Sequence, residues 1–259
     1  MISLIVNEVF TALKHLDSPL SAVASLVAIF LAAVAGAKCI YRGLRRLTQQ
    51  KPVDRLYKAL IAHSVVSKSE VVYQILNYLP PCFEDRKTIR KLFRQIKACS
   101  GEKQEAAAVF SVIGAPACGK TTTMRYLYCK LSRGRKCVYF QMQDVTSMDK
   151  LGSYLEKQKA ENHFGNRDSV VAFFDGLDEA HVFFQKENLD SMEEAFRSMF
   201  FFGGNSDMDK LFQAHGLNLE CTVVSLRPEF LERSTRSLTE LQHKNIYSNV
   251  YKILPLSDR

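Results

Sequence analysis

The residues with the most specific chemistry form a short loop that contains two glycines. The sequence GAPACGKT at 114–121 fits the pattern GxxxxGK[ST] at every position. It follows an apolar run and precedes a helical pattern, which is the context that a phosphate-binding loop requires. Glycines let backbone N–H groups turn toward phosphate oxygens, and the positive end of the following helix faces the same oxygens. We expect this loop to bind a nucleotide through Gly114, Ala115, Pro116, Ala117, Cys118, Gly119, Lys120, Thr121 and Thr122.

Carboxylates follow a later apolar run. Residues 170–174 read VVAFF, and Asp175 comes directly after them. A buried parallel strand would deliver Asp175 to the carboxyl edge of the sheet, where it could hold Mg²⁺ together with the Thr121 hydroxyl. Asp178 and Glu179 lie three and four residues further on. We expect them to orient and activate an attacking water, the alternative being that they are solvated loop acids.

A cation ends another apolar run. Residues 221–228 read CTVVSLRP, so Arg227 follows a strand that Pro228 ends. In a sheet that also carries the two motifs above, this strand end is expected near the γ-phosphate, where Arg227 could stabilise the charge. The candidate catalytic residues are therefore Glu179, Asp178 and Arg227.

Parallel strands must bring these motifs to one edge. Five unbroken apolar runs alternate with helical stretches, at 107–113, 137–141, 169–174, 221–226 and 247–254. Unbroken runs are typical of parallel strands that are buried on both faces. The alternation predicts right-handed crossovers and an α/β fold with a doubly wound parallel sheet over residues 105–259.

Taken together, the three motifs GAPACGKT, FFDGLDEA and SLRP resemble the NACHT group of STAND-type P-loop NTPases. Two details carry the resemblance, which covers residues 105–259. The residue after Asp175 is small and is followed by two acids, and the sensor strand ends in an Arg-Pro pair. Leu226 departs from the pattern, because a small or hydroxyl residue is commoner at that position.

This resemblance implies a nucleotide-dependent switch. It implies ATP or GTP as ligand, with ATP favoured, Mg²⁺ as cofactor, slow turnover and control of self-association, in innate immunity, cell death or defence against phage. It gives nucleotide, Mg²⁺ and sensor roles to Lys120, Thr121, Asp175, Glu179 and Arg227. The sequence ends at Arg259, soon after the last expected strand. We expect the helical lid and winged-helix modules of the group to belong to a longer chain or to a partner.

An uncharged apolar segment lies near the N-terminus. Residues 18–37 carry no charge, and about 20 apolar residues span a bilayer as one helix. We expect a transmembrane helix over 18–40 after a short amphipathic segment at 1–17; a cleaved signal peptide and a buried core helix are the alternatives. Positive charges follow the segment, which predicts an external N-terminus and a cytoplasmic NTPase domain. Small residues every four positions could let two anchors associate, although alanine is common in such segments.

Basic residues are concentrated after this segment. The net charge is +8, and the excess of lysine and arginine lies in residues 38–103. Residues 41–104 are expected to be helical. A capping box at Ser67 and Glu70 begins a helix that Pro80 and Pro81 are expected to end, and a basic amphipathic pattern covers 89–97. Near a membrane this basic face could contact anionic lipid; a solvated face of a small helical domain is the alternative. Because the NTPase region is nearly neutral, we do not expect nucleic-acid binding.

Composition excludes several classes of protein. A charged fraction of 24% with 10% aromatic residues excludes a disordered chain, and 12 glycines and 7 prolines exclude collagen-like repeats. The 7 cysteines show no zinc spacing and indicate reduced, mostly buried thiols. Two alternatives to the switch stay open. One is an AAA+-like motor ATPase that remodels a substrate at the membrane, and the other is a membrane-tethered interaction module with a regulatory nucleotide site.

Overall fold

The computed structural model describes residues 51–60, 67–99, 108–180, 206–235 and 249–254. The chain divides into two compact units, Met1–Lys51 and Pro52–Arg259, and the described residues belong almost entirely to the second. None of the described helices is long and apolar enough to cross a membrane. The amphipathic segment expected at 1–17 and the transmembrane helix expected at 18–40 lie outside the described residues.

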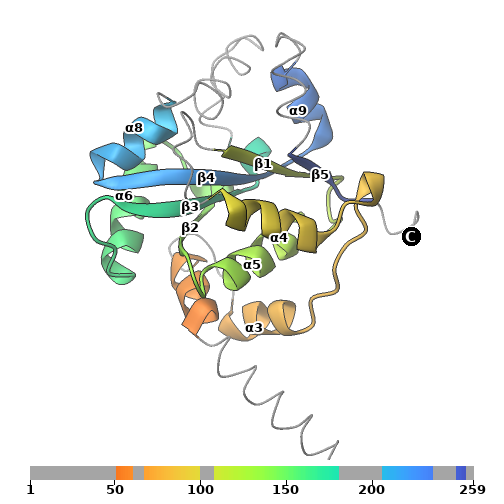
Figure 1. Cartoon of the computed structure of the whole chain (residues 1–259), viewed down its shortest axis with the longest axis horizontal. Helices are drawn as coiled ribbons and strands as arrows, with labels where there is room; N and C mark the ends of the chain where they lie inside the picture. The colour runs from red at the N-terminus through yellow and green to blue at the C-terminus, as the bar shows by residue number, and fades with distance from the viewer. Residues whose placement is uncertain (1–50, 61–66, 100–107, 181–205, 236–248, 255–259) are drawn as a thin grey trace, which may run out of the picture. The chain divides into compact units, whose positions relative to one another are not determined.

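A five-stranded parallel sheet forms the centre of the second unit (Figure 1). Its order is β2-β3-β4-β1-β5, so that β4 lies between the strand before the phosphate loop and the strand before Asp175. Each of the five predicted runs overlaps one strand, and β4 begins four residues before its run, which confirms the parallel α/β prediction. The strands are β1 (Ala108–Ile113), β2 (Lys136–Gln141), β3 (Asp168–Asp175), β4 (Leu217–Leu226) and β5 (Val250–Lys252).

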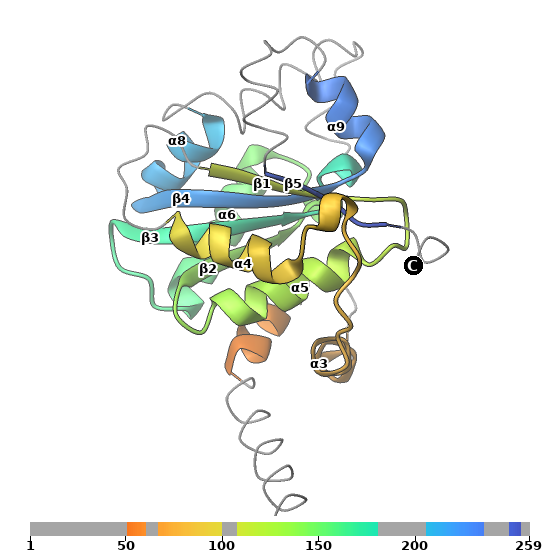
Figure 2. The ribbon, with the colours of Figure 1, turned by 45° about the vertical axis from the view of Figure 1, so that its right-hand side comes forward.

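Helices cover both faces of this sheet. Figures 1 and 2 show α3, α4 and α5 on one side and α8 and α9 on the other. The α5 side also includes the helix at 51–60. The helices are α3 (Lys68–Leu76), α4 (Ile89–Ala98), α5 (Lys120–Leu131), α6 (Met148–Glu161), α8 (Asp207–Ala214) and α9 (Pro228–Thr235), with single 3₁₀ turns η1 (Glu84–Arg86), η2 (Met142–Asp144) and η3 (Leu177–Glu179).

Strand residues alternate between two hydrophobic cores. In β3, Val170, Ala172 and Phe174 pack with α6, α8 and α9, whereas Val171 and Phe173 pack with α5 and the N-terminal helices. Because side chains alternate along a strand, the next residue, Asp175, faces the α5 side. The period of the strand thus directs this carboxylate toward the helix that begins at the phosphate loop.

The N-terminal helices share the core of the sheet. Val53, Leu56 and Leu60 of the first helix and Leu92 and Ile96 of α4 belong to the same buried cluster as the strands. The turn before α4 also pairs with the edge of the sheet, through a bridge between Phe83 and Ile253. The boundary expected at 104/105 therefore falls inside one compact unit.

The basic amphipathic helix is α4, and its apolar side is occupied by this core. Leu92 and Ile96 are fully buried, while Arg90, Lys91 and Arg94 are exposed. A helix whose apolar face packs on a sheet cannot also insert that face into lipid. The structure thus favours a solvated basic face, and contact with anionic lipid remains a proposal that rests on charge alone.

Helix α3 follows the predicted start but not the predicted end. Ser67 caps it, since its hydroxyl accepts a hydrogen bond from the Glu70 amide at 3.2 Å. The helix ends at Leu76 instead of continuing to the prolines at 80 and 81. The Asn77 side chain donates to the Tyr73 carbonyl at 3.0 Å and caps the last turn, which leaves Leu79 outside the helix and exposed.

Candidate functional site

The phosphate loop connects β1 to α5 and places the N-terminus of α5 at the carboxyl edge of the sheet. Gly119 precedes the helix with φ +98°, a conformation that glycine adopts without a steric cost. Lys120 and Thr121 open the helix, where backbone N–H groups have no partner within the helix. The loop thus presents the donors that an anion at a helix N-terminus requires.

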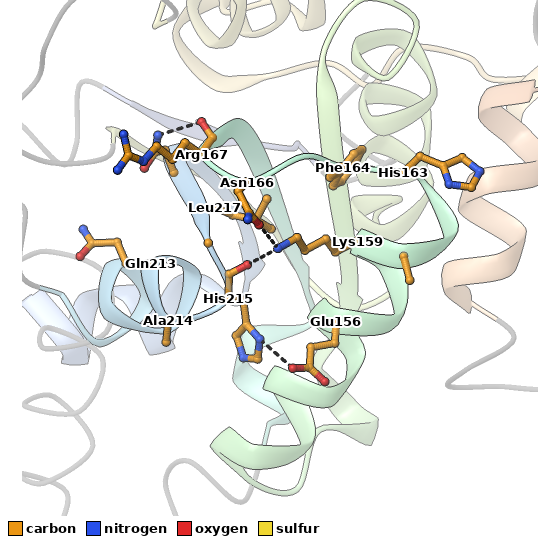
Figure 3. A pocket seen from close by; sticks show the side chains of 13 residues that line it. Glu156, Lys159, His163, Phe164, Asn166, Arg167, Gln213, Ala214, His215 and Leu217 are labelled. Carbon is orange, nitrogen blue, oxygen red and sulfur yellow. Dashed lines mark hydrogen bonds and ion pairs between the residues drawn. The ribbon is translucent and has the colours of Figure 1, made fainter.

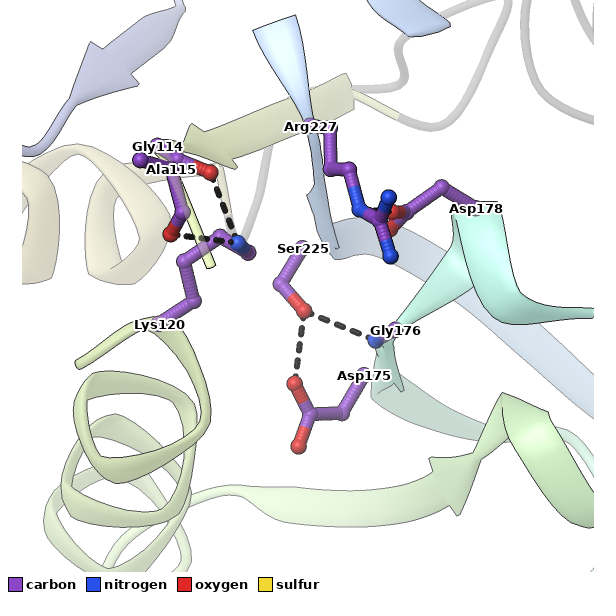
Figure 4. Close-up of polar contacts among 8 residues, drawn as sticks. All are labelled: Gly114, Ala115, Lys120, Asp175, Gly176, Asp178, Ser225 and Arg227. Atoms are coloured by element: carbon purple, nitrogen blue, oxygen red, sulfur yellow. Dashed lines mark hydrogen bonds and ion pairs between the residues drawn. The ribbon is translucent and has the colours of Figure 1, made fainter. Parts of the chain in front are cut away.

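Lys120 extends across this loop. Its ammonium donates to the carbonyl oxygens of Gly114 at 2.7 Å and Ala115 at 3.1 Å (Figure 4). Both acceptors lie in the phosphate loop, so the positive charge stays beside the N-terminus of α5. A phosphate bound there would meet the lysine and the helix N-terminus together.

Asp175 is buried at the site and accepts hydrogen bonds from neighbouring elements. It is only 4% exposed, and Ser225 of β4 donates to its Oδ1 at 2.6 Å. The same Ser225 hydroxyl accepts the Gly176 amide at 2.8 Å, and Thr121 donates to Oδ1 at 3.3 Å (Figure 4 draws the serine contacts). Three elements therefore hold one carboxylate beside the first turn of α5.

A tyrosine from β2 fixes the other oxygen of this carboxylate. Tyr139 is fully buried, and its hydroxyl donates to Asp175 Oδ2 at 2.7 Å. Burial raises the pKa of Tyr139 well above its ordinary value, and the neighbouring Asp175 charge acts in the same direction. The phenol consequently remains a neutral hydrogen-bond donor to the carboxylate throughout the physiological range.

The two acids after Asp175 have different surroundings. Gly176 has φ +72° and turns the chain into η3, so that Glu179 lies beside the cavity at the strand ends. Asp178 instead pairs with Arg227, its Oδ2 lying 2.8 Å from Nε. Burial raises the pKa of Asp178, while its hydrogen bonds and the charges of Lys120 and Arg227 oppose the shift. Asp178 is thus a partner of Arg227, whereas Glu179 faces the space where a substrate would lie.

Most of the predicted residues line one cavity of about 270 Å³ at the carboxyl edge, whereas Gly114, Ala115, Cys118, Thr122 and Asp178 do not line it. It receives side chains or backbone from every predicted motif and also from Gln141 at the end of β2 and Gln143 in η2. Its lining consists of Pro116, Ala117, Gly119, Lys120, Thr121, Gln141, Gln143, Asp175, Gly176, Glu179, Ser225 and Arg227. The loop predicted to bind phosphate, the predicted metal ligands and the predicted sensor arginine are therefore brought together.

The donor set fits Mg²⁺. Asp175 supplies a carboxylate and Thr121 a hydroxyl, and Mg²⁺ in nucleotide sites is bound by one or two such oxygens together with substrate phosphates and water. The described residues contain no cluster of three or more His, Cys, Asp or Glu side chains that could hold a metal ion. Of the 6 cysteines described, Cys129, Cys137 and Cys221 are buried and all six are free thiols.

Sequence reasoning did not assign a role to Ser225, Tyr139, Gln141 or Gln143. Their signal in the sequence is weak, because a serine or a tyrosine inside an apolar run is equally compatible with core packing. Tyr139 and Asp175 are separated by 36 residues, and only the pairing of β2 with β3 brings them together. The strand alternation described above could have placed both on one face, had the sheet order been known.

A second, larger cavity lies at the opposite edge of the sheet. Its volume is about 1000 Å³, and it is lined by the ends of α6 and α8 and by the loops that lead into β3 and β4 (Figure 3). Lys159 donates there to the His215 carbonyl at 2.6 Å and to Asn166 Oδ1 at 3.0 Å. His215 in turn approaches Glu156 at 3.3 Å. None of the predicted site residues lines this cavity.

The sheet order, the loop between β1 and α5, and the acid at the end of β3 define the fold of a P-loop nucleoside triphosphatase. Neither a family model nor a curated protein matches the sequence. Among solved structures, the chain is similar to Cdc6p from Pyrobaculum aerophilum, with 15% sequence identity and a TM-score of 0.40. The match covers 74% of this chain and 50% of that one, so the chain spans half the length of this neighbour. Its TM-score is too low to support a functional argument, and the class is assigned from the sheet and the loop themselves.

Proposed function

We propose that this chain binds a nucleoside triphosphate, with ATP favoured over GTP, together with Mg²⁺ and hydrolyses it slowly. The observation that carries the proposal is the convergence of Lys120, Thr121, Asp175, Glu179 and Arg227 on one cavity at the carboxyl edge of a parallel sheet. Ligands of open α/β sheets bind at this edge. The choice of ATP over GTP as the proposed ligand rests on the sequence resemblance alone.

The loop and the first turn of α5 would bind the phosphates. Backbone N–H groups of the loop and of the first turn of α5 would donate to the phosphate oxygens, and Lys120 would exchange the carbonyls of Gly114 and Ala115 for these oxygens. Thr121 and Asp175 would hold Mg²⁺, which when bound neutralises charge on the β- and γ-phosphates. Ser225 and Tyr139 keep Asp175 oriented through one hydrogen bond to each carboxylate oxygen.

Glu179 is the group best placed to act as general base. It lines the cavity, whereas Asp178 is 6% exposed and engaged by Arg227. In the proposed step, water attacks the γ-phosphorus, its proton passes to Glu179, and the bond from the γ-phosphorus to the bridging oxygen breaks. The products are the nucleoside diphosphate and inorganic phosphate.

Arg227 is the group best placed to respond to the γ-phosphate. Its side chain is 51% exposed and lines the cavity, and its closest contact with Asp178 is through Nε. A guanidinium carries five N–H donors, so the pair with Asp178 can orient Arg227 while other donors reach a phosphate oxygen. Gain or loss of the γ-phosphate would then change the contacts of Arg227, which follows β4, and of its partner Asp178 in η3.

We further propose that the chain works as a membrane-anchored switch of the NACHT type in defence or cell-death signalling. The support is the motif set, the apolar segment at 18–40 and the basic charge that follows it. ATP would favour self-association, and hydrolysis would reset it. Light scattering of the full chain in detergent should give a larger mass with ATP than with ADP. Equal masses would refute the proposed switch, but they would not contradict the proposed nucleotide site.

The nucleotide site itself is tested by binding of a fluorescent ATP analogue. Lys120→Ala should abolish binding, because it removes the one cation of the phosphate loop. Lys157→Ala is the matched control, since Lys157 is an exposed lysine of α6 away from the cavity. Unchanged affinity in Lys120→Ala would refute the proposed site, as would equal losses in both variants.

A further inference from the structure

The two oxygens of the Asp175 carboxylate have different neighbours. Oδ1 accepts hydrogen bonds from Ser225 at 2.6 Å and from Thr121 at 3.3 Å. Oδ2 accepts a hydrogen bond from Tyr139 at 2.7 Å. Thr121 and Ser225 line the cavity at the carboxyl edge, whereas Tyr139 is fully buried and does not line it. One oxygen is therefore bonded to residues of the cavity, and the other is bonded to a residue of the core.

The register of the sheet produces this division. Tyr139 of β2 pairs with Phe173 of β3, two residues before Asp175. Side chains two residues apart lie on the same face of a strand, so the phenol approaches the carboxylate along that face. Figure 4 shows the oxygen bonded to Ser225 on the side of Lys120, while the second oxygen points away from both residues. The phenol thus engages the oxygen that lies further from the phosphate loop.

Tyr139 is held in place at its backbone and at its ring. Its backbone N–H and C=O pair with the Gln158 side chain of α6 at 2.9 and 2.8 Å. Its ring stacks on Phe173 and meets Tyr128 edge-on, with centroids 6.2 and 5.6 Å away. A side chain packed in this way has little freedom to move, so it resists a rotation of the Asp175 carboxylate that would carry Oδ2 into the cavity.

These contacts limit what Asp175 can offer to a cation in the cavity. An ionised carboxylate oxygen has about two lone pairs. Ser225 uses one lone pair of Oδ1, and the other becomes free when the Thr121 hydroxyl turns its hydrogen away and offers its own lone pair to the cation. A cation that also contacted Oδ2 would meet the positive end of the Tyr139 O–H dipole. Asp175 can therefore offer one oxygen to the cation, but not both together.

The number of carboxylate oxygens on offer affects Mg²⁺ and Ca²⁺ differently. Mg²⁺ demands octahedral geometry at about 2.0–2.1 Å and usually keeps several waters, so single oxygens from separate groups suit it. Ca²⁺ takes about 6–8 oxygens at about 2.3–2.6 Å and can bind both oxygens of one carboxylate. Selectivity between the two cations depends on the number and the flexibility of the ligands. A rigid carboxylate that offers a single oxygen therefore favours Mg²⁺.

We propose that Tyr139 is a positioning residue that restricts Asp175 to one oxygen and thereby makes the nucleotide site select Mg²⁺ over Ca²⁺. This inference rests on the proposed nucleotide function and deepens it, because it assigns the choice of cation to a particular residue. Tyr139 does not line the cavity, so it acts on the cation through Asp175. Ser225 instead donates to the oxygen that would face the cation, so it should support both cations to the same degree.

The test compares two variants of the full chain with one matched control. Tyr139→Phe removes the donor to Oδ2 and keeps the ring, and Ser225→Ala removes a donor to Oδ1. The control is Tyr128→Phe. Tyr128 is also fully buried, its ring lies 5.6 Å from that of Tyr139, and its hydroxyl has no hydrogen-bond partner among the described residues. The two phenylalanine variants thus differ in whether the lost hydroxyl contacts Asp175.

The measurement is the dissociation constant of a fluorescent, non-hydrolysable ATP analogue in saturating Mg²⁺, in saturating Ca²⁺ and in EDTA. The wild type and Tyr128→Phe should bind the analogue more tightly with Mg²⁺ than with Ca²⁺. In Tyr139→Phe, binding with Mg²⁺ should weaken about tenfold, as expected for loss of a residue that orients a metal ligand, while binding with Ca²⁺ stays the same or becomes tighter. Ser225→Ala should weaken binding with both cations by the same factor, and binding in EDTA should not change in Tyr139→Phe.

Three results would overturn the inference. The first is equal affinity of the wild type for the analogue with Mg²⁺ and with Ca²⁺. The second is a ratio of the two affinities in Tyr139→Phe that equals the ratio in Tyr128→Phe. The third is an equal loss of binding by Tyr139→Phe under all three conditions, which would assign a structural role to Tyr139. Failure of the wild type to bind the analogue under any of the conditions would instead refute the proposed function.

Discussion

One cavity lies at the carboxyl ends of the strands and another at their amino ends. The candidate site residues line the smaller cavity, at the carboxyl ends. The carboxyl-edge cavity of about 270 Å³ collects the start of α5 and the acids after β3, whereas the amino-edge cavity of about 1000 Å³ collects the ends of α6 and α8. Helix N-termini attract anions, and helix C-termini present carbonyl groups that attract cations. In a parallel sheet, the direction of the chain therefore decides which edge can bind phosphate.

The lysines at the two edges illustrate this difference. Lys120, the first residue of α5, donates to two carbonyls of the phosphate loop. Lys159 caps the carbonyl of His215 after α8 and is held there by Asn166 as well. A lysine is thus a candidate phosphate ligand at the carboxyl edge, whereas another lysine is a structural cap at the amino edge. Volume alone would have selected the other cavity.

Among the predictions that test this difference between the two edges, the largest effect is expected on the hydrolysis rate when Glu179 is substituted. Glu179→Gln should lower the hydrolysis rate by about 10²–10⁴-fold, the range for loss of a general base, while nucleotide binding is retained. Single-turnover hydrolysis measures this directly. Asp178→Asn should lower the rate much less, because Asp178 is engaged by Arg227. A larger loss in Asp178→Asn than in Glu179→Gln would reverse the assignment of the base.

A smaller effect at the same edge is expected at Ser225. Ser225→Ala removes the donor to Asp175 Oδ1 and the acceptor for the Gly176 amide. The Mg²⁺ concentration needed for half-maximal hydrolysis should rise about 10-fold or more. Thr222, a buried residue earlier on β4, is the control, and Thr222→Val should leave this concentration unchanged. An unaltered Mg²⁺ dependence in Ser225→Ala would show that Asp175 needs no such support.

At the amino edge, the expected effect is on stability instead of activity. Lys159→Ala removes hydrogen bonds to His215 and Asn166 and should lower the free energy of unfolding by about 1–2 kcal/mol. Urea denaturation followed by circular dichroism measures this change. Nucleotide affinity under native conditions should remain that of the wild type. Loss of nucleotide binding in this variant would break the distinction between the two edges.

The smallest effect concerns the pH dependence of stability at the carboxyl edge. Since burial raises the pKa of Asp178 in the folded chain, the native state binds the Asp178 proton more tightly than the unfolded state. The contribution of this group to stability should therefore fall as pH rises from about 4, the unfolded pKa, through its raised folded pKa. Asp178→Asn should remove that fall, which urea titrations across this pH range detect. A steeper fall in the variant would contradict the assignment.

Much of the fold and of the site follows from local patterns. Each of the five apolar runs overlaps one strand, and the loop at 114–121, Asp175 and Arg227 all lie at the strand ends where the patterns predict them. Parallel strands buried on both faces need continuous apolar sequence, and a loop that binds phosphate needs glycine at fixed positions. Short stretches of sequence show whether these requirements are met, so these features can be predicted without knowledge of the fold.

The amphipathic helix at 89–98 shows where local patterns are insufficient. The pattern over residues 89–97 gives the helix and its apolar face, but not the surface that the face covers. In the structure Leu92 and Ile96 pack on the core shared with β1, β3 and β4, so the basic side alone remains for a partner. A membrane and a protein core both accept an apolar helix face, and only the tertiary structure distinguishes them.

By itself, the sequence determined the class of fold, the phosphate loop and the acids and the cation expected around it. Only the tertiary structure decided that Asp178 pairs with Arg227 while Glu179 faces the cavity. It alone joined Tyr139 of β2 to Asp175 of β3, and Gln74 of α3 to Arg125 of α5. The physical reason is that strand and loop patterns depend on neighbouring residues, whereas these contacts depend on the order of strands in the sheet and on which helix packs over them.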